Sequence, residues 1–127
     1  MSFRMGTILW QALAVTGLLC KPGFAVDLSG TWIVSTQLTT GQRSQPTFTL
    51  VQEGEILSGV YQGVLGKSSI TGKIHGTSVT WEYETKIGFT KVRAVYTGII
   101  KSATEMTGNM TFNEGKLASG TWTGKKK

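Results

Sequence analysis

Apolar and polar residues alternate along nearly the whole of residues 26–127. A period of two predicts β-strands that bury one face, whereas an amphipathic helix requires a period near 3.6. Glycine-containing turns interrupt the alternation at short intervals, and Gly54 and Gly115 suit tight hairpins because glycine adopts positive φ at little cost. Eight strands are therefore predicted, over residues 29–38, 46–53, 55–63, 68–75, 77–85, 90–101, 104–112 and 116–124.

The same alternation predicts which side chains share the buried face of these strands. The set is Trp32, Val34, Phe48, Leu50, Leu57, Tyr61, Ile70, Ile74, Val79, Trp81, Tyr83, Ala94, Tyr96, Ile100, Met106, Met110, Phe112 and Trp122. Thr, Ser, Lys and Glu dominate the opposite face, with a few apolar exceptions such as Ile33 and Ile99. One apolar face per strand and short links predict an antiparallel meander. Closing it into an eight-stranded up-and-down barrel, an all-β fold, removes edge strands that would otherwise template aggregation.

A short motif recurs along the chain and opens and closes the predicted barrel. "LSGTW" at 28–32 returns as "ASGTW" at 118–122, and related copies occupy 57–61, 70–74, 96–100 and 106–110. The first and last copies are expected to pair antiparallel and close the barrel. If Gly30 lies near Gly120, then Trp32 meets Ala118 and Trp122 meets Leu28. The glycine of each copy falls on the inward face. It either allows the strands to coil sharply or leaves a hollow for a ligand, and both interpretations stay open.

Residues 1–25 have the three-part layout of a secretory signal peptide. A short basic start precedes an apolar run at 5–20, and small residues follow up to Ala25. Cleavage after Ala25 would release a secreted or periplasmic β-barrel domain at 26–127. A retained anchor helix is less favoured because the run is shorter than the ~20 apolar residues that span a bilayer. Lipid modification of Cys20 is a further alternative.

Composition narrows the possible chemistry of the domain. Cys20 is the only cysteine, so residues 26–127 have no disulfide and no thiolate nucleophile. The net charge of +6 falls to +4 when Arg4 and Lys21 leave with the signal peptide. This modest excess includes the terminal "KKK" at 125–127, which by default is a solvated tail. No nucleic-acid partner is expected, because a basic face interleaved with aromatic residues is missing.

The motif "GTW" at 30–32 resembles the G-x-W signature of the calycin superfamily, which includes lipocalins, fatty-acid-binding proteins and avidins. The short eight-strand chain is most similar to the avidin and streptavidin family. "TFTLVQEGEILSGVYQGVLG" at 47–66, "SVTWEYE" at 78–84 and "VYTGII" at 95–100 follow in that family's order. The resemblance implies a barrel that encloses a ligand.

The resemblance also assigns residues to the ligand. Tyr61 matches the tyrosine that hydrogen-bonds the biotin carbonyl, and Trp81 matches a tryptophan that packs on the ligand. Tyr96 and Met110 stand where the family has other ligand-facing tryptophans. The positions of further polar biotin contacts hold Val34, Leu38 and Gly63. A buried urea group without those contacts would cost roughly 1–3 kcal/mol per unsatisfied atom, so the resemblance implies the scaffold without tight biotin binding.

No arrangement of residues predicts catalysis, a metal or a cofactor. His75 is the only histidine, lies at a strand end, and has no second ligand at metal-binding spacing. Glu82 and Glu84 are two residues apart on one outward face. They are expected to pair across strands with Lys73 or Arg93 rather than to form an acid–base couple.

Two functions remain after these exclusions. The first is a non-enzymatic barrel that binds a small, mainly apolar or aromatic ligand at its mouth. Its predicted ligand-binding residues are Tyr61, Trp81, Tyr96 and Met110. The alternative is a protein-binding module, such as a secreted or envelope inhibitor of a hydrolase, with a solid core. That module would use the loops at 39–45 and 85–91, where Phe89 lies between two lysines. Neither function requires stable membrane insertion once the signal peptide is removed.

Overall fold

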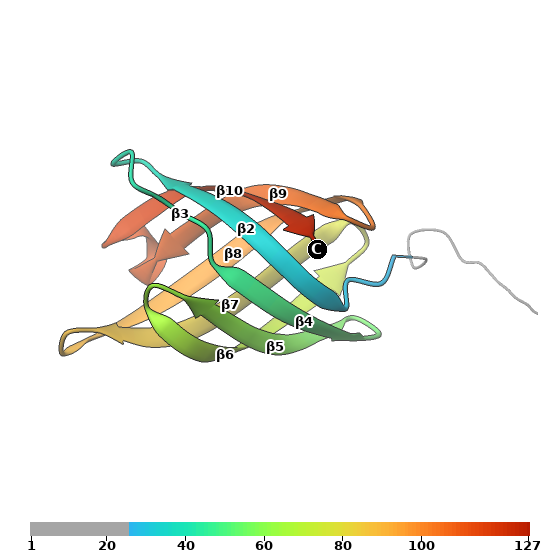
Figure 1. Ribbon diagram of the computed structural model, residues 1–127, viewed down its shortest axis with the longest axis horizontal. Helices are drawn as coiled ribbons and strands as arrows, with labels where there is room; N and C mark the ends of the chain where they lie inside the picture. Colours follow the sequence, from blue (N-terminus) through green and yellow to red (C-terminus); the bar gives the residue numbers. More distant parts are fainter. Residues whose placement is uncertain (1–25) are drawn as a thin grey trace, which may run out of the picture.

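The computed structural model describes residues 26–127, which form a closed antiparallel β-barrel (Figure 1). The strands are β2 (Gly30–Leu38), β3 (Arg43–Ser44), β4 (Thr47–Glu53), β5 (Ile56–Gly63), β6 (Gly66–His75), β7 (Ser78–Ile87), β8 (Thr90–Ser102), β9 (Glu105–Phe112) and β10 (Ala118–Lys126), with a 3-10 turn, η1 (Asn113–Gly115). Consecutive strands pair with each other, except that β3 and β4 both pair with β2, and β10 pairs with β2 to close the barrel. The predicted all-β, eight-stranded up-and-down barrel is confirmed, with β3 as a short addition. The predicted signal peptide at 1–25 lies outside the described residues.

The first long loop is shorter than the sequence predicted. Within the stretch 39–45, Arg43 and Ser44 pair with β2 and form β3. Pro46 then interrupts the ladder because proline has no N–H to donate, although its carbonyl oxygen still accepts from the Val34 N–H at 3.0 Å. β3 and β4 therefore both pair with the same edge of β2, in one continuous register. The alternation of apolar and polar residues did not predict β3, because Pro46 interrupts the pattern between the two strands.

The C-terminal lysines were expected to form a solvated tail, and that expectation was wrong. β10 continues through Lys126, whose N–H donates to the Thr104 carbonyl oxygen at 2.9 Å. The Lys126 ammonium also donates to the Asp27 carbonyl oxygen at 3.2 Å. The last residues thus take part in closing the barrel.

The first and last strands pair antiparallel, as predicted, but not in the register that would bring Gly30 near Gly120. Gly120 lies opposite Leu38, not near Gly30, and Lys126 lies opposite Trp32. The reason is the stagger that barrel closure imposes. A line of paired residues drawn round the barrel runs through Gln52, Leu57, Gly72, Trp81, Tyr96, Met110 and Gly120 to Leu38.

Extending the β2–β4 register from Gly30↔Leu50 places Gln52 opposite Leu28. The line therefore returns to β2 at Leu38, ten residues from its start. Such a shear tilts the strands by about 40° to the barrel axis. Two copies of one motif at the ends of the meander cannot face each other under this stagger.

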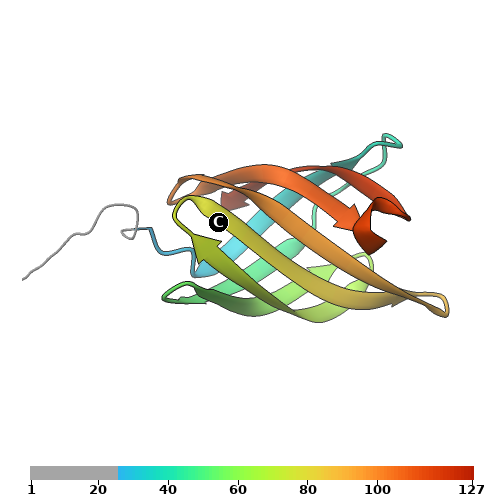
Figure 2. The same cartoon turned by 180° about the vertical axis from the view of Figure 1, so that it is seen from behind.

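The inward face agrees closely with the predicted set. Every predicted inward residue is buried except Phe112, which is half-buried at the end of β9. The core also includes Leu28, Val92 and Thr36, which the prediction omitted. A side view from behind shows the same strands wrapping a single interior (Figure 2). Within residues 26–127, no helix is long and apolar enough to cross a membrane.

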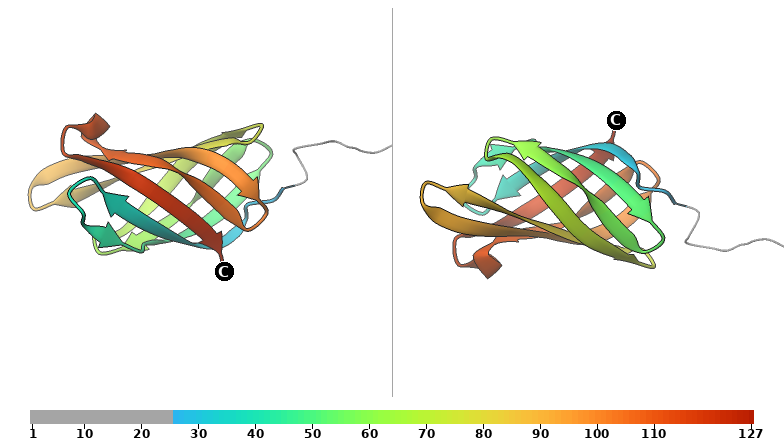
Figure 3. Two further views of the ribbon diagram at one scale, coloured as in Figure 1. Left: turned by 90° about the horizontal axis from the view of Figure 1, so that it is seen from above. Right: turned by 90° about the horizontal axis from the view of Figure 1, so that it is seen from below.

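The barrel has two ends that differ in their turns (Figure 3). At one, which we call the N-terminal end, residue 26 enters beside the turns at 54–55, 76–77 and 103–104. At the other, which we call the tyrosine end, lie the turns at 39–42, 64–65 and 88–89 together with η1.

The entering chain caps the N-terminal end. Leu28 is fully buried, and its carbonyl oxygen accepts from the Trp32 indole at 2.8 Å. The Leu28 N–H donates to the Gln52 side-chain oxygen at 2.8 Å, and the Gln52 N–H donates to the Ser29 hydroxyl at 2.9 Å. These bonds satisfy backbone groups that would otherwise be unpaired where the chain crosses the opening.

Candidate ligand-binding site

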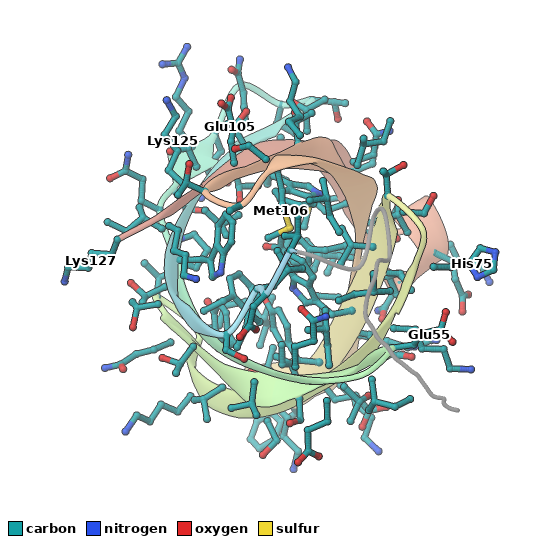
Figure 4. The ribbon with its side chains drawn as sticks, turned by 90° about the vertical axis from the view of Figure 1, so that its right-hand side faces the viewer. Glu55, His75, Glu105, Met106, Lys125 and Lys127 are labelled. Atoms are coloured by element: carbon teal, nitrogen blue, oxygen red, sulfur yellow. The ribbon has the colours of Figure 1, made fainter. Side chains whose placement is uncertain are left out.

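Aromatic side chains fill the middle of the barrel. Phe48 lies at their centre, with ring centroids 5.5 Å from Tyr61, 5.3 Å from Trp81 and 5.3 Å from Tyr96. Trp81 stacks on Tyr96 at 5.6 Å and 10°. A view along the barrel shows Met106 inside the ring of strands and charged residues such as Lys127 and Glu55 pointing away from it (Figure 4). Side chains in tilted and stacked contact at these distances leave no wide central channel.

The glycines of the repeated motif allow the strands to approach closely. A Cβ atom at Gly59 would collide with the Thr49 carbonyl oxygen, and one at Gly108 would collide with the Thr97 carbonyl oxygen. The clashing atoms belong to neighbouring strands of the wall. These positions therefore support strand coiling, the first of the two interpretations, and not a hollow beneath the motif.

The four predicted ligand-binding residues lie at two depths. Tyr61 and Tyr96 line a cleft at the tyrosine end. Trp81 and Met110 are buried below them and do not line that cleft. The Trp81 indole N–H is buried without a hydrogen-bond partner among residues 26–127, which is an uncommon and costly state for a buried donor.

The cleft at the tyrosine end has a volume of about 140 Å³. It is lined by Thr36, Leu38, Gln42, Arg43, Ser44, Pro46, Tyr61, Val64, Leu65, Tyr83, Tyr96 and Phe112. Its size is close to that of a cavity that holds one benzene-sized ring, roughly 150 Å³. Apolar walls of Leu38, Pro46 and Phe112 with a few converging polar groups are typical of small-molecule sites.

Hydroxyl groups converge at the floor of the cleft. Tyr61 stacks on Tyr83 with centroids 4.2 Å apart and 12° between the rings. The Tyr61 hydroxyl accepts a hydrogen bond from the Leu65 N–H at 3.3 Å. Thr36 is only 5% exposed, and its hydroxyl forms no hydrogen bond of standard geometry within residues 26–127, although it lies near enough to the Tyr96 hydroxyl to influence the pKa of that group. The floor therefore offers a buried polar group that a ligand could satisfy.

Burial changes the ionisation of two of these tyrosines. Desolvation raises the pKa of Tyr96 to about 12, against a smaller opposing effect from the neighbouring Thr36 and Tyr83 hydroxyls. The pKa of Tyr83 is raised well above its ordinary value, first by burial and then by the adjacent Tyr96 and Tyr61. Both phenols are therefore protonated at neutral pH and can each donate one hydrogen bond.

Glycine is needed directly beside one of these hydroxyls. A Cβ atom at Gly63 would lie 2.5 Å from the Tyr61 hydroxyl oxygen. Gly63 also occupies the position where the avidin resemblance expected a polar contact. Because glycine has no side chain, it leaves room for the Tyr61 hydroxyl. This position therefore accommodates the tyrosine and does not supply a polar contact.

The rim of the cleft is formed by β3 and the loops around it. Arg43 is the one charged residue of the lining, and Gln42 and Ser44 flank it. The two loops predicted to contact a protein, 39–45 and 85–91, both stand at this end of the barrel (Figure 1). Ligand and protein contacts, predicted as alternatives, would thus share one end of the molecule.

Sequence reasoning missed Thr36 and Tyr83 as site residues. Tyr83 was predicted to face inward but was not assigned to the ligand. Thr36 follows Trp32 and Val34 at intervals of two, and this periodicity was a signal for an inward hydroxyl.

A larger hollow of about 620 Å³ lies on the outer wall across β6, β7, β8 and β9. Most of its polar residues, including His75, Thr97 and Asn109, are exposed to solvent. Water already satisfies these groups, so the hollow offers less to a small ligand than the cleft does. We therefore place the candidate site at the tyrosine end.

The residues considered for catalysis lie on the outer surface. His75 is exposed, with its Nδ1 atom 3.9 Å from a Glu55 carboxylate oxygen. Glu82 forms an ion pair with Arg93, as expected, and this hydrogen-bonded pair lowers the pKa of Glu82. In residues 26–127, no three His, Cys, Asp or Glu side chains gather closely enough to hold a metal ion.

No protein-family model and no curated protein sequence matches the chain. Solved structures do match, and redesigned β-barrels are among them. A redesigned β-barrel, b11L5F_LGL, has a TM-score of 0.65 and 18% identity over 79% of this chain and 91% of its own. EF1p2_mFAP2b, bound to DFHBI, has a TM-score of 0.62 and 18% identity over 79% and 94%. The redesigned β-barrel mFAP1, bound to DFHBI, has a TM-score of 0.59 and 20% identity over 79% and 94%. At these identities the similarity establishes the eight-stranded barrel fold.

Proposed function

We propose that the protein is a non-enzymatic, secreted or periplasmic barrel that binds a small, mainly apolar, aromatic ligand in the cleft at the tyrosine end. The observation that carries the proposal is the Thr36 hydroxyl, which is buried beside the cleft and, although close to the Tyr96 hydroxyl, forms no hydrogen bond of standard geometry among the described residues. Leaving such a group unsatisfied costs roughly 1–3 kcal/mol, which a ligand that bonds to it would recover. Two designed barrels of the same fold hold the small molecule DFHBI.

The ligand is expected to bind in one orientation. Its ring would lie between Leu38, Pro46 and Phe112, and a polar atom on the ring would face Thr36 and the tyrosine hydroxyls. Tyr61 and Tyr96 are then direct contacts. Trp81 supports Tyr96 by stacking on it, and Met110 supports the floor from below. The avidin-like scaffold inferred from the sequence is compatible with this arrangement, while biotin is not favoured as the ligand.

The test is a titration of the purified protein followed by tryptophan fluorescence. The probes are DFHBI, biotin and a single-ring phenol, with Trp81 as the reporter because it contacts Tyr96. Thr36→Val preserves shape and removes the hydroxyl, and we expect it to weaken binding about tenfold. Thr97→Val on the outer wall is the matched control and should leave binding unchanged. Absence of binding by every probe, or equal loss in both variants, would contradict the proposal.

A second candidate function is protein binding through the loops at 39–45 and 85–91. Phe89 favours it, because its side chain is fully exposed between Lys86 and Lys91. A protein partner seated there would cover the cleft. It would therefore compete with a bound small ligand. A titration with a purified hydrolase, followed by release of the ligand, measures this competition.

Export is part of the proposal and has its own test. N-terminal sequencing of the protein recovered outside the cytoplasm should begin at Val26. A product that retains residues 5–20, or one that begins at a lipid-modified Cys20, would contradict cleavage after Ala25. Either result would indicate that the protein is anchored to a membrane.

A further inference from the structure

The turns of the tyrosine end expose apolar side chains to solvent. Four large ones stand on three separate turns, with exposed fractions of 106% for Phe89, 88% for Val64, 52% for Leu117 and 45% for Ile87. Figure 1 shows the turn that carries Phe89 as the gold hairpin projecting furthest from the barrel at this end. Phe89 and Val64 are the two most exposed large apolar side chains among residues 26–127, and both stand at this end.

Basic side chains surround these turns. They are Arg43, Lys67, Lys86, Lys91 and Lys116, and none forms an ion pair with any residue that the structure describes. The acidic residues closest in sequence and register are Glu82, Glu84 and Glu114. Glu82 and Glu114 both contact Arg93. The end therefore presents uncompensated positive charge around apolar tips.

One pair of these lysines opposes folding. Lys86 and Lys91 lie directly opposite each other in the β7–β8 hairpin. Like charges at directly opposed positions destabilise a strand pair. At the N-terminal end the corresponding position is complementary, because Lys125 lies opposite Glu105. An anion between Lys86 and Lys91 would remove the repulsion.

We propose that the tyrosine end docks reversibly onto an anionic lipid surface. Phe89, Val64 and Leu117 enter the headgroup and upper acyl region, and the lysines lie among the lipid phosphates. This is peripheral adsorption, in which apolar insertion and attraction to anionic lipid add together. It does not depend on the ligand proposed for the cleft.

Lipid fits these residues better than a protein partner does. The apolar tips protrude from different turns and are separated by lysines. A protein hot spot gathers its apolar side chains in one packed centre within a polar rim. A fluid lipid layer accepts separate tips at once, and each basic residue near an anionic surface strengthens binding about fivefold.

The experiment is sedimentation with lipid vesicles of the protein purified as residues 26–127, whose strands close the barrel among themselves. Vesicles of phosphatidylcholine with about one-third phosphatidylglycerol are compared with pure phosphatidylcholine. We expect binding to the anionic vesicles, much weaker binding to the neutral ones, and loss of binding at high salt.

Matched variants locate the contact. Phe89→Ser should weaken vesicle binding about tenfold, while Ile56→Ser, on an isoleucine 54% exposed at the N-terminal end, should have no effect. Replacing Lys86 and Lys91 by Gln should weaken binding to anionic vesicles about twentyfold. The same change at Lys73 and Lys101 should have little effect.

A spectroscopic measurement separates insertion from simple charge attraction. Trp32, Trp81 and Trp122 are buried, so Phe89→Trp introduces an exposed indole. Its emission should shift to the blue and become protected from acrylamide on anionic vesicles. The proposal is overturned if the protein does not bind anionic vesicles, or if Ile56→Ser is as harmful as Phe89→Ser. It is also overturned if an acidic protein displaces the vesicles and binds Phe89→Ser as tightly as the parent, because the surface would then recognise charge alone.

Discussion

The two ends of the barrel differ in how their openings are covered. At the N-terminal end, the entering chain covers the opening, and Leu28, Gln52 and Trp32 satisfy one another's hydrogen-bonding groups. At the tyrosine end, the Thr36 hydroxyl forms no hydrogen bond of standard geometry among the described residues, and Phe89 is fully exposed. The first end carries features that stabilise the fold, and the second carries features that cost stability. Residues that oppose folding are often retained for binding.

The largest expected effect is at the N-terminal end. Trp32→Ala removes a fully buried indole and leaves the Leu28 carbonyl oxygen without its donor. We expect the free energy of unfolding to fall by about 3–5 kcal/mol, measured by urea denaturation. Phe89→Ala at the tyrosine end is the control and should change it by less than about 0.5 kcal/mol, since that side chain is exposed. Similar losses in the two variants would remove the distinction between the ends.

High pH should lower the free energy of unfolding, because of the buried Tyr83 and Tyr96 at the tyrosine end. The folded-state pKa of Tyr96 is about 12 and that of Tyr83 is raised further, whereas an unfolded tyrosine titrates near 10. Above about pH 10 the unfolded chain releases phenol protons that the folded protein retains, so stability is full below this pH and falls as pH rises. Each of the two tyrosines contributes about 1.4 kcal/mol per pH unit, for Tyr96 up to about pH 12.

The pH dependence is measured by urea denaturation between about pH 8 and pH 11.5, with tyrosinate absorbance as a second signal. Tyr83→Phe should reduce the slope above pH 10 by about half. Trp32→Phe, at the N-terminal end, should leave the slope unchanged. A parent protein whose stability is level above pH 10 would show that the phenols are hydrated in the folded state.

Local alternation was enough to predict most of the fold. Inward and outward positions depend only on the period of two within each strand, so residues such as Phe48, Trp81 and Trp122 were assigned correctly. The closing register could not be predicted in this way, because the stagger accumulates over all eight strands and no single segment contains it. The motif shared by the first and last strands suggested a symmetric closure that the shear excludes.

The candidate site was predictable only in part. Tyr61 and Tyr96 were placed by resemblance to avidins, and both line the cleft. The depth at which Trp81 and Met110 lie depends on how the aromatic rings pack against Phe48, which the pattern does not specify. Pro46 concealed β3, and with it the position of Arg43 on the rim.

A smaller effect is expected from the hydrogen bonds that cap the N-terminal end. Gln52→Ala removes the acceptor of the Leu28 N–H and the donor to the Gly54 carbonyl oxygen. The free energy of unfolding should fall by about 1–2 kcal/mol in urea denaturation. Gln45→Ala provides the comparison near the other end, because Gln45 bonds only to the exposed Ser35 hydroxyl at 3.2 Å. If both changes cost the same, the cap is not a special stabilising feature.

The smallest expected effect is an increase in stability, whereas most substitutions lower the free energy of unfolding. Lys86→Glu turns the repulsive pair with Lys91 into an attractive one, so the free energy of unfolding should rise by about 0.2–1 kcal/mol. Lys125→Glu at the N-terminal end does the opposite, since it places two carboxylates opposite each other at Glu105, and should lower stability by a similar amount. Both changes are measured by thermal unfolding at low salt, where surface charges are least screened. Lys86→Glu should also weaken binding to anionic vesicles about twentyfold, because it changes the net charge by the same two units as the double Gln variant. A variant that is more stable and yet binds more weakly would show that the tyrosine end gives up stability for recognition, whereas a destabilised Lys86→Glu would mean that the two lysines do not repel each other in the folded hairpin.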